Sequence, residues 1–539
     1  MSTTMSIACT SLSFAWRDGT PVFEDLDVAF GPGRTGLVGV NGSGKSTLLK
    51  LIAGELTPAE GLVRVAGEVG HLPQNVTLDT RLRVDEALGI AARRAALHAI
   101  EAGDVSEEHF ETVGDDWDVE ERALATLGEL GLGHIELDRT VGELSGGESV
   151  LLRLAALLLR RPDVLLLDEP TNNLDLYARR RLYAAVSSWS GVMVVVSHDR
   201  ELLDLVDQIA DLRGGEVTWY GGNFSAYEEA LATEQEAAER MVRVAESDLR
   251  KQKRELADAQ MKLARRKRYG QKMWDQKREP KIVMGARKRA AQESAGKHRI
   301  MHEERLAEAK ERLDDAVEAV RDDDEIRVDL PYTAVPQGRD VLTLLDLELA
   351  YGARVAGGLD LRGPERVALI GRNGAGKTTL LRTIAGELAP VSGEAHAHVP
   401  LRFLPQRLDV LDGELSVVEN VARFAPGATN NRIRARLARF LFRGARADQK
   451  AATLSGGERF RAALAALMLA EPAPQLLMLD EPTNNLDMAS VRQLTTALES
   501  YEGALIVASH DLPFLESIGI TRWLLLDGEL RETEPAEVG

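Results

Sequence analysis

The sequence has one cysteine and no long apolar run, and these two absences exclude several classes of protein. Cys9 has no partner for an internal disulfide, which excludes a secreted scaffold held together by disulfides. The longest apolar runs, such as 154–159 and 192–196, fall far short of the roughly 20 residues that span a bilayer. Residues 1–10 hold no basic segment followed by an apolar one. We therefore expect a cytoplasmic protein with no export signal and no membrane partner.

The length and the charge of the chain limit its domain organisation and its partners. At 539 residues the chain is too long for one hydrophobic core, because such cores stop growing at roughly 250–300 residues. Hydrophobic residues make up 44%, which excludes a wholly disordered chain. The net charge of −19 argues against a nucleic-acid partner for the chain as a whole. Residues 251–300, however, hold 17 Lys and Arg against 5 Asp and Glu, so the positive charge is concentrated in one central segment.

Five motifs occur twice in the same order, which indicates a duplicated domain. The offset between the copies is 332 for the first two pairs and 310 to 312 for the other three, so the first copy holds 22 additional residues between Gln74 and Leu144. We expect a helical arm at about 87–121, with a turn near Gly103. The pairs are Gly39–Thr47 with Gly371–Thr379, Leu72–Gln74 with Leu404–Gln406, Leu144–Glu148 with Leu454–Glu458, Leu167–Asp175 with Leu479–Asp487, and Ser197–Asp199 with Ser509–Asp511.

The first motif of each copy lies between a strand-like and a helix-like apolar run, where a phosphate loop belongs. Its backbone N–H groups would wrap the phosphates of ATP, Lys45 and Lys377 would reach the β and γ oxygens, and Ser46 and Thr378 would bind Mg²⁺. The other loop residues expected to hold ATP are Gly39, Asn41, Gly42, Gly44 and Thr47, and in the second copy Gly371, Asn373, Gly374, Gly376 and Thr379.

Two further apolar runs, 164–167 and 476–479, are typical of buried parallel strands, and each ends in Asp-Glu. The two carboxylates of each pair would have different roles. Asp168 and Asp480 would support Mg²⁺ through water, and Glu169 and Glu481 would polarise the attacking water as general bases.

Polar residues at matching places in both copies complete the predicted catalytic set. Gln74 and Gln406 could contact the metal and the attacking water. His198 and His510 each follow their glutamate by 29 residues and could hold the γ-phosphate. A single histidine is more often structural, but this pair recurs at identical spacing.

Ser145-Gly146-Gly147 and Ser455-Gly456-Gly457 each begin a helix rich in Ala and Leu, which predicts a second phosphate-binding helix N-terminus. Together the motifs resemble the nucleotide-binding domain of ATP-binding-cassette proteins. The resemblance implies that each of these segments completes the ATP site of the opposite domain, so that the two cassettes pair within one chain and the protein is a monomer. It also matches Trp16 and Tyr351 to the family's adenine-stacking aromatic, although each could equally be an ordinary strand aromatic.

The tandem cassettes, the insertion in the first and a charged helical linker resemble the ABC-F branch of that family. The resemblance implies an α/β fold of two tandem ATP-binding-cassette domains joined by an antiparallel α-helical coiled-coil linker. The expected domains are 1–230, with the arm at 87–121, a linker at 231–325 with a basic tip at 265–296, and 326–539.

The linker is predicted from a seven-residue repeat. Val242, Leu249, Leu256 and Leu263 recur every seven residues, and Leu306, Leu313 and Val320 repeat this spacing, as expected for two paired helices. The first helix is predicted over 236–268, with a break at Tyr269-Gly270.

The predicted tip clusters cationic and aromatic side chains that could bind RNA, although a solvated helix face is the alternative. The candidate RNA-binding residues are Arg265, Arg266, Lys267, Arg268, Tyr269, Lys272, Trp274, Lys277, Arg278, Lys281, Arg287, Lys288 and Arg289.

The ABC-F resemblance implies an ATPase acting on the ribosome. In the ATP-bound closed state it would bind the exit-tRNA site, contacting large-subunit rRNA and peptidyl-tRNA, and hydrolysis would release it. The short arm and extended tip favour antibiotic resistance by ribosomal protection over a housekeeping factor that gates elongation. More distant alternatives are the ATPase subunit of a transporter and a DNA-repair or chromosome ATPase.

Overall fold

The computed structural model describes residues 6–74, 79–172, 174–275, 300–302, 304–317, 330–484 and 486–534. By internal contacts the chain divides into two compact units. One comprises Met1–Phe224 and Asp324–Gly539, and the other is Ser225–Asp323. Because the first unit holds both cassettes, this division does not test the domain boundaries predicted from the sequence.

The first cassette is built on two sheets. A three-stranded antiparallel sheet has the order β2-β1-β4, and a six-stranded sheet has the order β5-β6-β7-β3-β8-β9, parallel except for its last strand. The strands are β1 (Ile7–Ala15), β2 (Pro21–Phe30), β3 (Gly33–Val38), β4 (Glu60–Val65), β5 (Val69–Leu72), β6 (Val164–Asp168), β7 (Val192–Val196), β8 (Gln208–Arg213) and β9 (Glu216–Gly221).

Strand β6 is buried on both faces, and its side chains alternate between two hydrophobic cores. Leu165 and Leu167 belong to the core beneath the helices, whereas Val164 and Leu166 pack with the antiparallel sheet and α1. A strand covered on both sides has a continuous apolar sequence, as the run 164–167 predicts.

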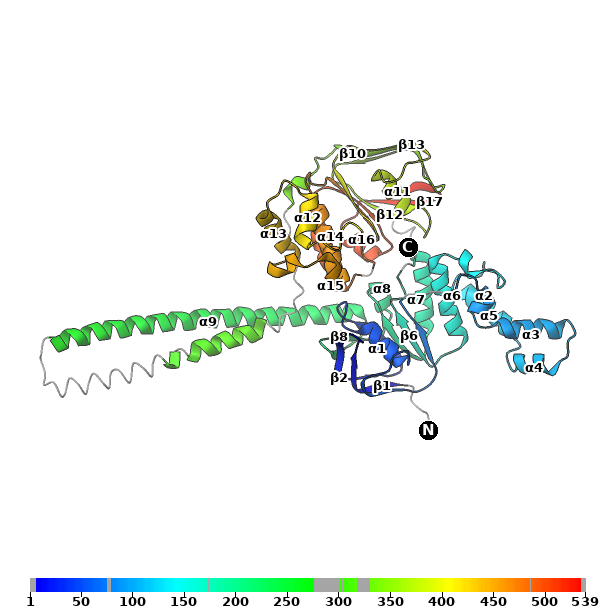
Figure 1. Ribbon diagram of the computed structural model, residues 1–539, viewed down its shortest axis with the longest axis horizontal. Coiled ribbons are helices and arrows are strands. Elements are labelled where there is room, and N and C mark those ends of the chain that lie inside the picture. The colour runs from blue at the N-terminus through cyan, green and yellow to red at the C-terminus, as the bar shows by residue number, and fades with distance from the viewer. Residues whose placement is uncertain are drawn as a thin grey trace. The chain divides into compact units, whose positions relative to one another are not determined.

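The helices of the first cassette connect and cover these strands. Two of them, α3 and α4, lie in the segment predicted to be the arm, and Gly103 between them has φ 98°. The helices are α1 (Lys45–Ile52), α2 (Val84–Ala87), α3 (Ala91–Glu101), α4 (Glu107–Val113), α5 (Val119–Glu129), η1 (Val141–Glu143), α6 (Gly146–Leu159), α7 (Leu176–Ser188) and α8 (Arg200–Leu203) (Figure 1).

The second cassette repeats this strand order but joins all nine strands into one sheet, β13-β10-β11-β18-β17-β12-β16-β15-β14. The junction is a parallel pairing of Arg354 in β11 with Glu529 in β18. The strands are β10 (Asp340–Glu348), β11 (Arg354–Arg362), β12 (Arg366–Ile370), β13 (Ser392–Ala397), β14 (Leu401–Leu404), β15 (Leu476–Asp480), β16 (Ala504–Ala508), β17 (Arg522–Asp527) and β18 (Glu529–Thr533).

The helices of the second cassette follow the same plan without the two arm-region helices. They are η2 (Pro331–Thr333), α11 (Lys377–Ile384), α12 (Val417–Phe424), α13 (Asn430–Leu437), η3 (Ala438–Phe440), η4 (Gly444–Asp448), η5 (Ala451–Thr453), α14 (Gly456–Met468), α15 (Met488–Glu499) and α16 (Leu512–Ser517).

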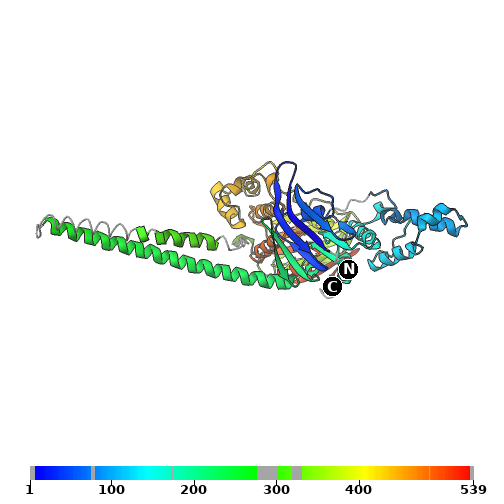
Figure 2. The same ribbon diagram turned by 90° about the horizontal axis from the view of Figure 1, so that it is seen from below.

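Within its described residues, the second unit holds one long helix and a shorter one. The long helix α9 (Phe224–Asp275) has 52 residues, about 78 Å at 1.5 Å per residue. A shorter helix at 300–317, with residue 303 outside the described part, lies alongside α9 in both views (Figures 1 and 2). An ion pair of 3.5 Å links Arg312 to Asp248 of α9. A coiled-coil geometry for this pair stays a prediction.

The predicted limits of the first linker helix are wrong at both ends. The helix begins at Phe224 rather than near residue 236, and it continues through Tyr269 and Gly270 to Asp275. A single helical glycine costs only about 1 kcal/mol relative to alanine, and the strong helix formers around Gly270 offset that cost. Glycine alone was therefore too weak a signal for a helix break.

Candidate functional site

The glycine-rich loops have backbones that only glycine fits. Gly39 and Gly371 have φ of 150° and 155°. A Cβ added at Gly39 would lie 2.4 Å from the carbonyl oxygen of Leu212, and one at Gly371 would lie 2.3 Å from that of Leu526. Both distances are too short for any side chain. Each loop therefore lies directly against a neighbouring strand of its own sheet, β8 for Gly39 and β17 for Gly371.

Each loop leads into a helix whose first backbone N–H groups have no side-chain cap. Gly44 and Gly376 are left-handed, with φ 100° and 101°, and they begin α1 and α11 without a side-chain cap. The first N–H groups of both helices are thus left for an anion, where the helix dipole also favours negative charge.

The loop lysines fold back over the loops. The Lys45 Nζ donates to the carbonyls of Gly39 at 2.8 Å and Val40 at 3.1 Å. The Lys377 Nζ donates to Gly371 at 2.7 Å and Arg372 at 3.3 Å. Both side chains are buried, and burial lowers the pKa of each ammonium group. A lysine desolvated in this way gains much from an anionic ligand such as phosphate.

A hydroxyl and a carboxylate meet beside each loop. The Ser46 hydroxyl donates to Asp168 at 3.0 Å, and the Thr378 hydroxyl donates to Asp480 at 2.7 Å. Burial raises the pKa of both aspartates. Oxygen donors of this kind fit Mg²⁺, which is held by few protein ligands and completed by phosphate and water.

The predicted general bases lie directly after β6 and β15 in left-handed backbone. Glu169 and Glu481 have φ 48° and 46°, a conformation that is uncommon outside glycine and that concentrates at functional sites. It is held by backbone hydrogen bonds of 2.8 Å, from Glu169 to Val196 and from Glu481 to Ala508.

Burial also perturbs the titration of these glutamates. The pKa of Glu169 is raised to about 8 and that of Glu481 to about 7, in each case chiefly because the carboxylate loses water. A carboxylate with a pKa near neutrality is well matched to proton transfer at physiological pH.

The two repeated histidines lie against these glutamates. The Nε2 of His198 is 3.1 Å from Glu169, and that of His510 is 3.4 Å from Glu481. Burial lowers the pKa of His198 to about 3 and that of His510 well below its usual value, so both rings are neutral. The His510 Nε2 also lies 3.0 Å from the Lys377 Nζ.

The predicted second phosphate-binding elements are the N-termini of α6 and α14. Ser145 and Ser455 cap these helices, and each forms a capping box with a glutamate three residues later. Gly146 and Gly456 are exposed, whereas Gly147 and Gly457 are buried. A Cβ at Gly457 would lie 2.4 Å from the Ser490 hydroxyl, so a side chain there would force that hydroxyl to move.

Four other predicted ATP residues, Gln74, Gln406, Trp16 and Tyr351, are exposed. Gln74 and Gln406 follow β5 and β14. Trp16 is 43% exposed and packs edge-on against Phe14, and Tyr351 is 83% exposed. Within the described chain, none of the four makes a side-chain hydrogen bond to the phosphate loops or the paired carboxylates.

Two aspartates that the sequence analysis did not include among the site residues link the motifs of the two cassettes. Asp487 caps α15 with Oδ1 and with Oδ2 accepts the backbone N–H of Asn41 at 3.0 Å. Asp175 caps α7 in the same way and accepts the N–H of Asn373 at 3.3 Å. Both aspartates end the repeated Leu-Asp-Glu-Pro-Thr-Asn-Asn-Leu-Asp motif, so their recurrence was a signal that could have identified them.

A third link has no counterpart among the described residues of the repeat. The Arg179 guanidinium, on α7, donates to the carbonyl oxygen of His510 at 3.3 Å and pairs with Asp199 at 3.4 Å. At the offset of 312 the corresponding residue is Val491, which has no charge. Arg372 adds a cation–π contact across the ring of Tyr177, 5.1 Å from its centroid.

The predicted RNA-binding residues are only partly described. The side chains of Arg265, Arg268, Tyr269 and Lys272 are exposed on α9. The backbones of Arg266, Lys267 and Trp274 are helical, but their side chains lie outside the described part. Outside the described residues altogether are Lys277, Arg278, Lys281, Arg287, Lys288 and Arg289.

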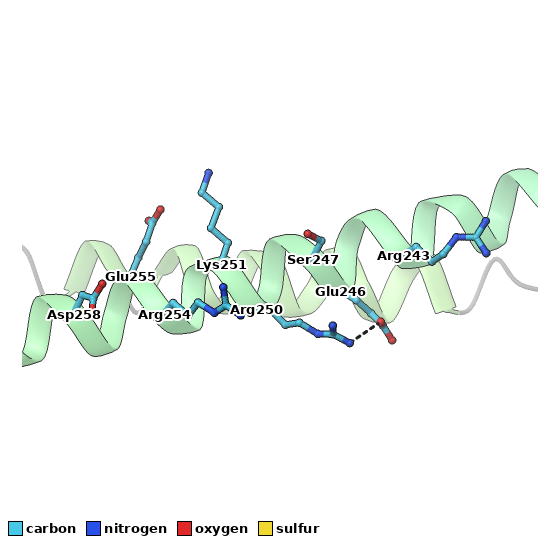
Figure 3. Close-up of a pocket in the computed structure, with 8 residues that line it drawn as sticks. All are labelled: Arg243, Glu246, Ser247, Arg250, Lys251, Arg254, Glu255 and Asp258. Carbon is cyan, nitrogen blue, oxygen red and sulfur yellow. Dashed lines mark hydrogen bonds and ion pairs between the residues drawn. The ribbon is translucent and has the colours of Figure 1, made fainter.

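Closer to the middle of α9, a shallow pocket of about 520 Å³ is lined by one helix alone. Figure 3 shows its side chains spread along α9, with Arg250 paired to Glu246 at 3.3 Å. Acidic and basic residues are mixed in this lining, as on a solvated helix face. We assign no ligand to this pocket.

Comparison with known proteins identifies the family. Residues 23–172 and 358–484 match the family model described as ABC transporter. The ATP-binding cassette sub-family F member 3 of Pongo abelii is 30% identical over 533 residues, which cover 95% of this chain and 70% of that protein. The chain belongs to the ABC-F family.

Two other relatives of this ABC-F chain are bacterial. The Probable ATP-binding protein YheS of Escherichia coli (strain K12) is 33% identical over 548 residues, 96% of this chain and 78% of that protein. The Tylosin resistance ATP-binding protein TlrC of Streptomyces fradiae is 34% identical over 524 residues, 92% of each chain.

Solved structures share the fold. A crystal structure of archaeal ribosome recycling factor aABCE1 with ribosomal stalk protein aP1 matches with a TM-score of 0.54 and 19% identity, covering 97% of this chain and 89% of that one. With the family established, the two cassettes are ATP-binding domains and the chain is an ATP hydrolase. Among the described residues, no helix is both long and apolar enough to span a bilayer.

Proposed function

We propose that this ABC-F ATPase binds the ribosome in an ATP-bound closed state and leaves it on hydrolysis, and that it protects the ribosome from an antibiotic. The observation that carries the resistance role is the similarity to the tylosin resistance protein TlrC over 92% of both chains. In this proposal the partners are large-subunit rRNA and peptidyl-tRNA at the exit-tRNA site, which implies a cytoplasmic location.

In each cassette the phosphate loop binds the ATP triphosphate through the free N–H groups at the start of α1 or α11. Lys45 and Lys377 then exchange their loop carbonyl partners for the β and γ oxygens. The Ser46–Asp168 and Thr378–Asp480 pairs hold Mg²⁺, with Gln74 and Gln406 as further oxygen donors. When bound, this ion neutralises charge that develops on the transferred phosphoryl group.

Glu169 and Glu481 orient and deprotonate the attacking water. The rings of His198 and His510 lie beside these carboxylates, with Nε2 atoms 3.1 and 3.4 Å away, and each neutral ring would donate its one N–H to the γ-phosphate when ATP is bound. The left-handed backbone at each glutamate fixes its direction before ATP arrives, so less reorganisation is needed during reaction.

Each ATP site is completed by the opposite cassette. Ser145, Gly146 and Gly147 act on the ATP held by Lys377, and Ser455, Gly456 and Gly457 on the ATP held by Lys45. The contacts of Asp487 with Asn41 and of Asp175 with Asn373 support this pairing, because they tie each phosphate loop to the other cassette. Trp16 and Tyr351 stack on the adenines in this arrangement.

The linker carries the RNA contact. Exposed Arg265, Arg268 and Lys272 would neutralise phosphates, and exposed Tyr269 would stack on an unpaired base. The remaining predicted tip cations lie close to these in the sequence. A housekeeping role that gates elongation would use the same chemistry and differs in its phenotype.

Ribosome co-sedimentation tests the proposal. The Glu169→Gln, Glu481→Gln double variant should retain ATP and stay closed, so we expect ATP-dependent pelleting with the large subunit that weakens as salt rises. The matched sample contains ADP. Absence of pelleting while ATP stays bound would overturn the ribosomal role.

The resistance role needs a separate test in cells. Cells lacking the protein should become more sensitive to at least one antibiotic that targets the large subunit. Unchanged sensitivity to a panel of such drugs, together with altered translation rates, would assign the protein to the housekeeping kind instead.

A further inference from the structure

A cleft in the second cassette, built from residues that the ATP site does not use, has an arginine-rich lining. It encloses about 670 Å³ between α13, the segment 468–475 and the turn at η2. Three arginines line it, namely Arg432 and Arg436 of α13 and Arg439 of η3, together with Tyr332 of η2.

The three arginines share one helical face. Their spacing of four and three residues places them above one another along α13 and the turn that continues it. Ile433, Leu437 and Phe440 on the other face are buried in the core. Packing therefore fixes the helix and directs the guanidinium groups outward, where Arg432 and Arg439 are exposed and Arg436 is half-buried.

These guanidinium groups have no acidic partner within the described part of the chain. Arg434, on the same helix, differs because it pairs with Asp448. Residues 430–447 hold six arginines and no aspartate or glutamate, in a chain whose net charge is −19. The only acidic residue of the cleft lining is Glu471, so the lining keeps a net positive charge.

The rest of the lining suits a flat ring. Tyr332 is 70% exposed, and beside it the cleft offers the apolar side chains of Leu330, Met468 and Leu469. Arginine forks recognise phosphate, and an exposed aromatic ring stacks on an unpaired base. An acidic protein segment would satisfy the arginines but would leave the exposed tyrosine ring without a role.

We propose that this cleft binds an unpaired segment of RNA, with phosphates on Arg432, Arg436 and Arg439 and a base stacked on Tyr332. The proposal rests on the proposed function, in which the RNA belongs to the ribosome. The linker would then be one RNA contact, and this cleft of the second cassette would be another.

A pair of charge-matched variants tests the arginines. Arg432→Gln with Arg439→Gln removes two cleft cations, and Arg339→Gln with Arg531→Gln removes two exposed arginines of the same cassette that do not line the cleft. Each pair is made in the Glu169→Gln, Glu481→Gln protein and measured with ATP and ribosomes at several salt concentrations. The slope of log affinity against log salt should fall by about 1.4 for the cleft pair, since each phosphate contact of a single strand contributes roughly 0.7. The matched pair should leave the slope unchanged.

Tyr332 gives a second measurement. Tyr332→Ala should weaken binding of a fluorescent ten-nucleotide oligouridylate by about tenfold in anisotropy, and Tyr332→Phe should restore it, because stacking needs only the ring. Photocrosslinking of 4-thiouridine-labelled ribosomes to the full chain should yield an RNA-linked peptide that contains Tyr332.

The outcomes separate this proposal from the proposed function. If the parent protein does not pellet with ribosomes, the ribosomal role fails, and the oligouridylate measurement still decides whether the cleft binds RNA. If the parent pellets but both arginine pairs behave alike and no RNA attaches near Tyr332, the cleft proposal is overturned. A crosslink from the cleft to a ribosomal protein would overturn it as well.

Discussion

The guanidinium of Arg179 in the first cassette donates a hydrogen bond of 3.3 Å to the carbonyl oxygen of His510 in the second. The side chain is nearly buried and also pairs with Asp199, which in turn accepts from the Tyr183 hydroxyl at 2.7 Å. At the matching place of the second cassette stands Val491. The two ATP sites are therefore not equivalent, because within the described residues His510 is held from the opposite cassette in this way and His198 is not.

Replacing Arg179 should slow one ATP site and spare the other. In a Glu169→Gln background only the Glu481 site can hydrolyse ATP, and there Arg179→Val should lower kcat about tenfold, because a hydrogen bond from a charged group is worth roughly 1.5–3 kcal/mol. In a Glu481→Gln background the same change should leave kcat unaltered. Steady-state ATPase rates of the four proteins check this.

A general loss of stability in the Arg179 variant would lower the ATPase activity in both backgrounds. Without Arg179, the buried carboxylate of Asp199 loses its ion-pair partner, so we expect the folded protein to be somewhat less stable. Arg179→Lys keeps a charge beside Asp199 without the planar fork and serves as the control. Equal loss of activity in both backgrounds would mean that Arg179 is structural only.

Much of the fold and of the ATP sites could be predicted because local sequence determines them. Gly39 and Gly371, the paired carboxylates and the helix-capping serines are set by short motifs whose chemistry needs those residues in that order. The contact of Arg179 could not be predicted, because its acceptor is a backbone carbonyl 331 residues away and the repeat has valine there. Similarly, the continuation of α9 through Gly270 depends on the whole helix rather than on one residue.

The two glutamates should give different pH profiles. The pKa of Glu169 is raised to about 8 and that of Glu481 to about 7, and each must be ionised to act as a base. Activity should thus rise with pH through each pKa. The Glu481→Gln variant, which depends on Glu169, should reach half of its maximal kcat/KM about one pH unit above the Glu169→Gln variant. Coincident midpoints would contradict the difference in environment.

The first glycine of each loop should not tolerate a methyl group. Gly371→Ala would place a Cβ 2.3 Å from the Leu526 carbonyl, so the loop must shift and ATP affinity should fall at least tenfold. Gly374→Ala is the matched control, since it also has positive φ, 81°, but no atom within 4 Å of an added Cβ. Binding of a fluorescent ATP analogue to each variant distinguishes the steric effect from general backbone strain. Similar affinities for the two variants would show that the close approach to Leu526 does not matter.

The contact between Asp487 and Asn41 can be separated from helix capping by choice of substitution. Asp487 uses Oδ1 to cap α15 and Oδ2 to accept the Asn41 N–H at 3.0 Å. Asp487→Ser keeps a good N-cap but is too short to bridge both groups, whereas Asp487→Ala also loses the cap, at a cost of about 1 kcal/mol. We expect both variants to lose ATPase activity at the site of Lys45 to a similar extent, while thermal unfolding shows destabilisation mainly for alanine. If serine restored full activity, capping of α15 would be the whole role of Asp487, and the bond to the opposite phosphate loop would not contribute to catalysis.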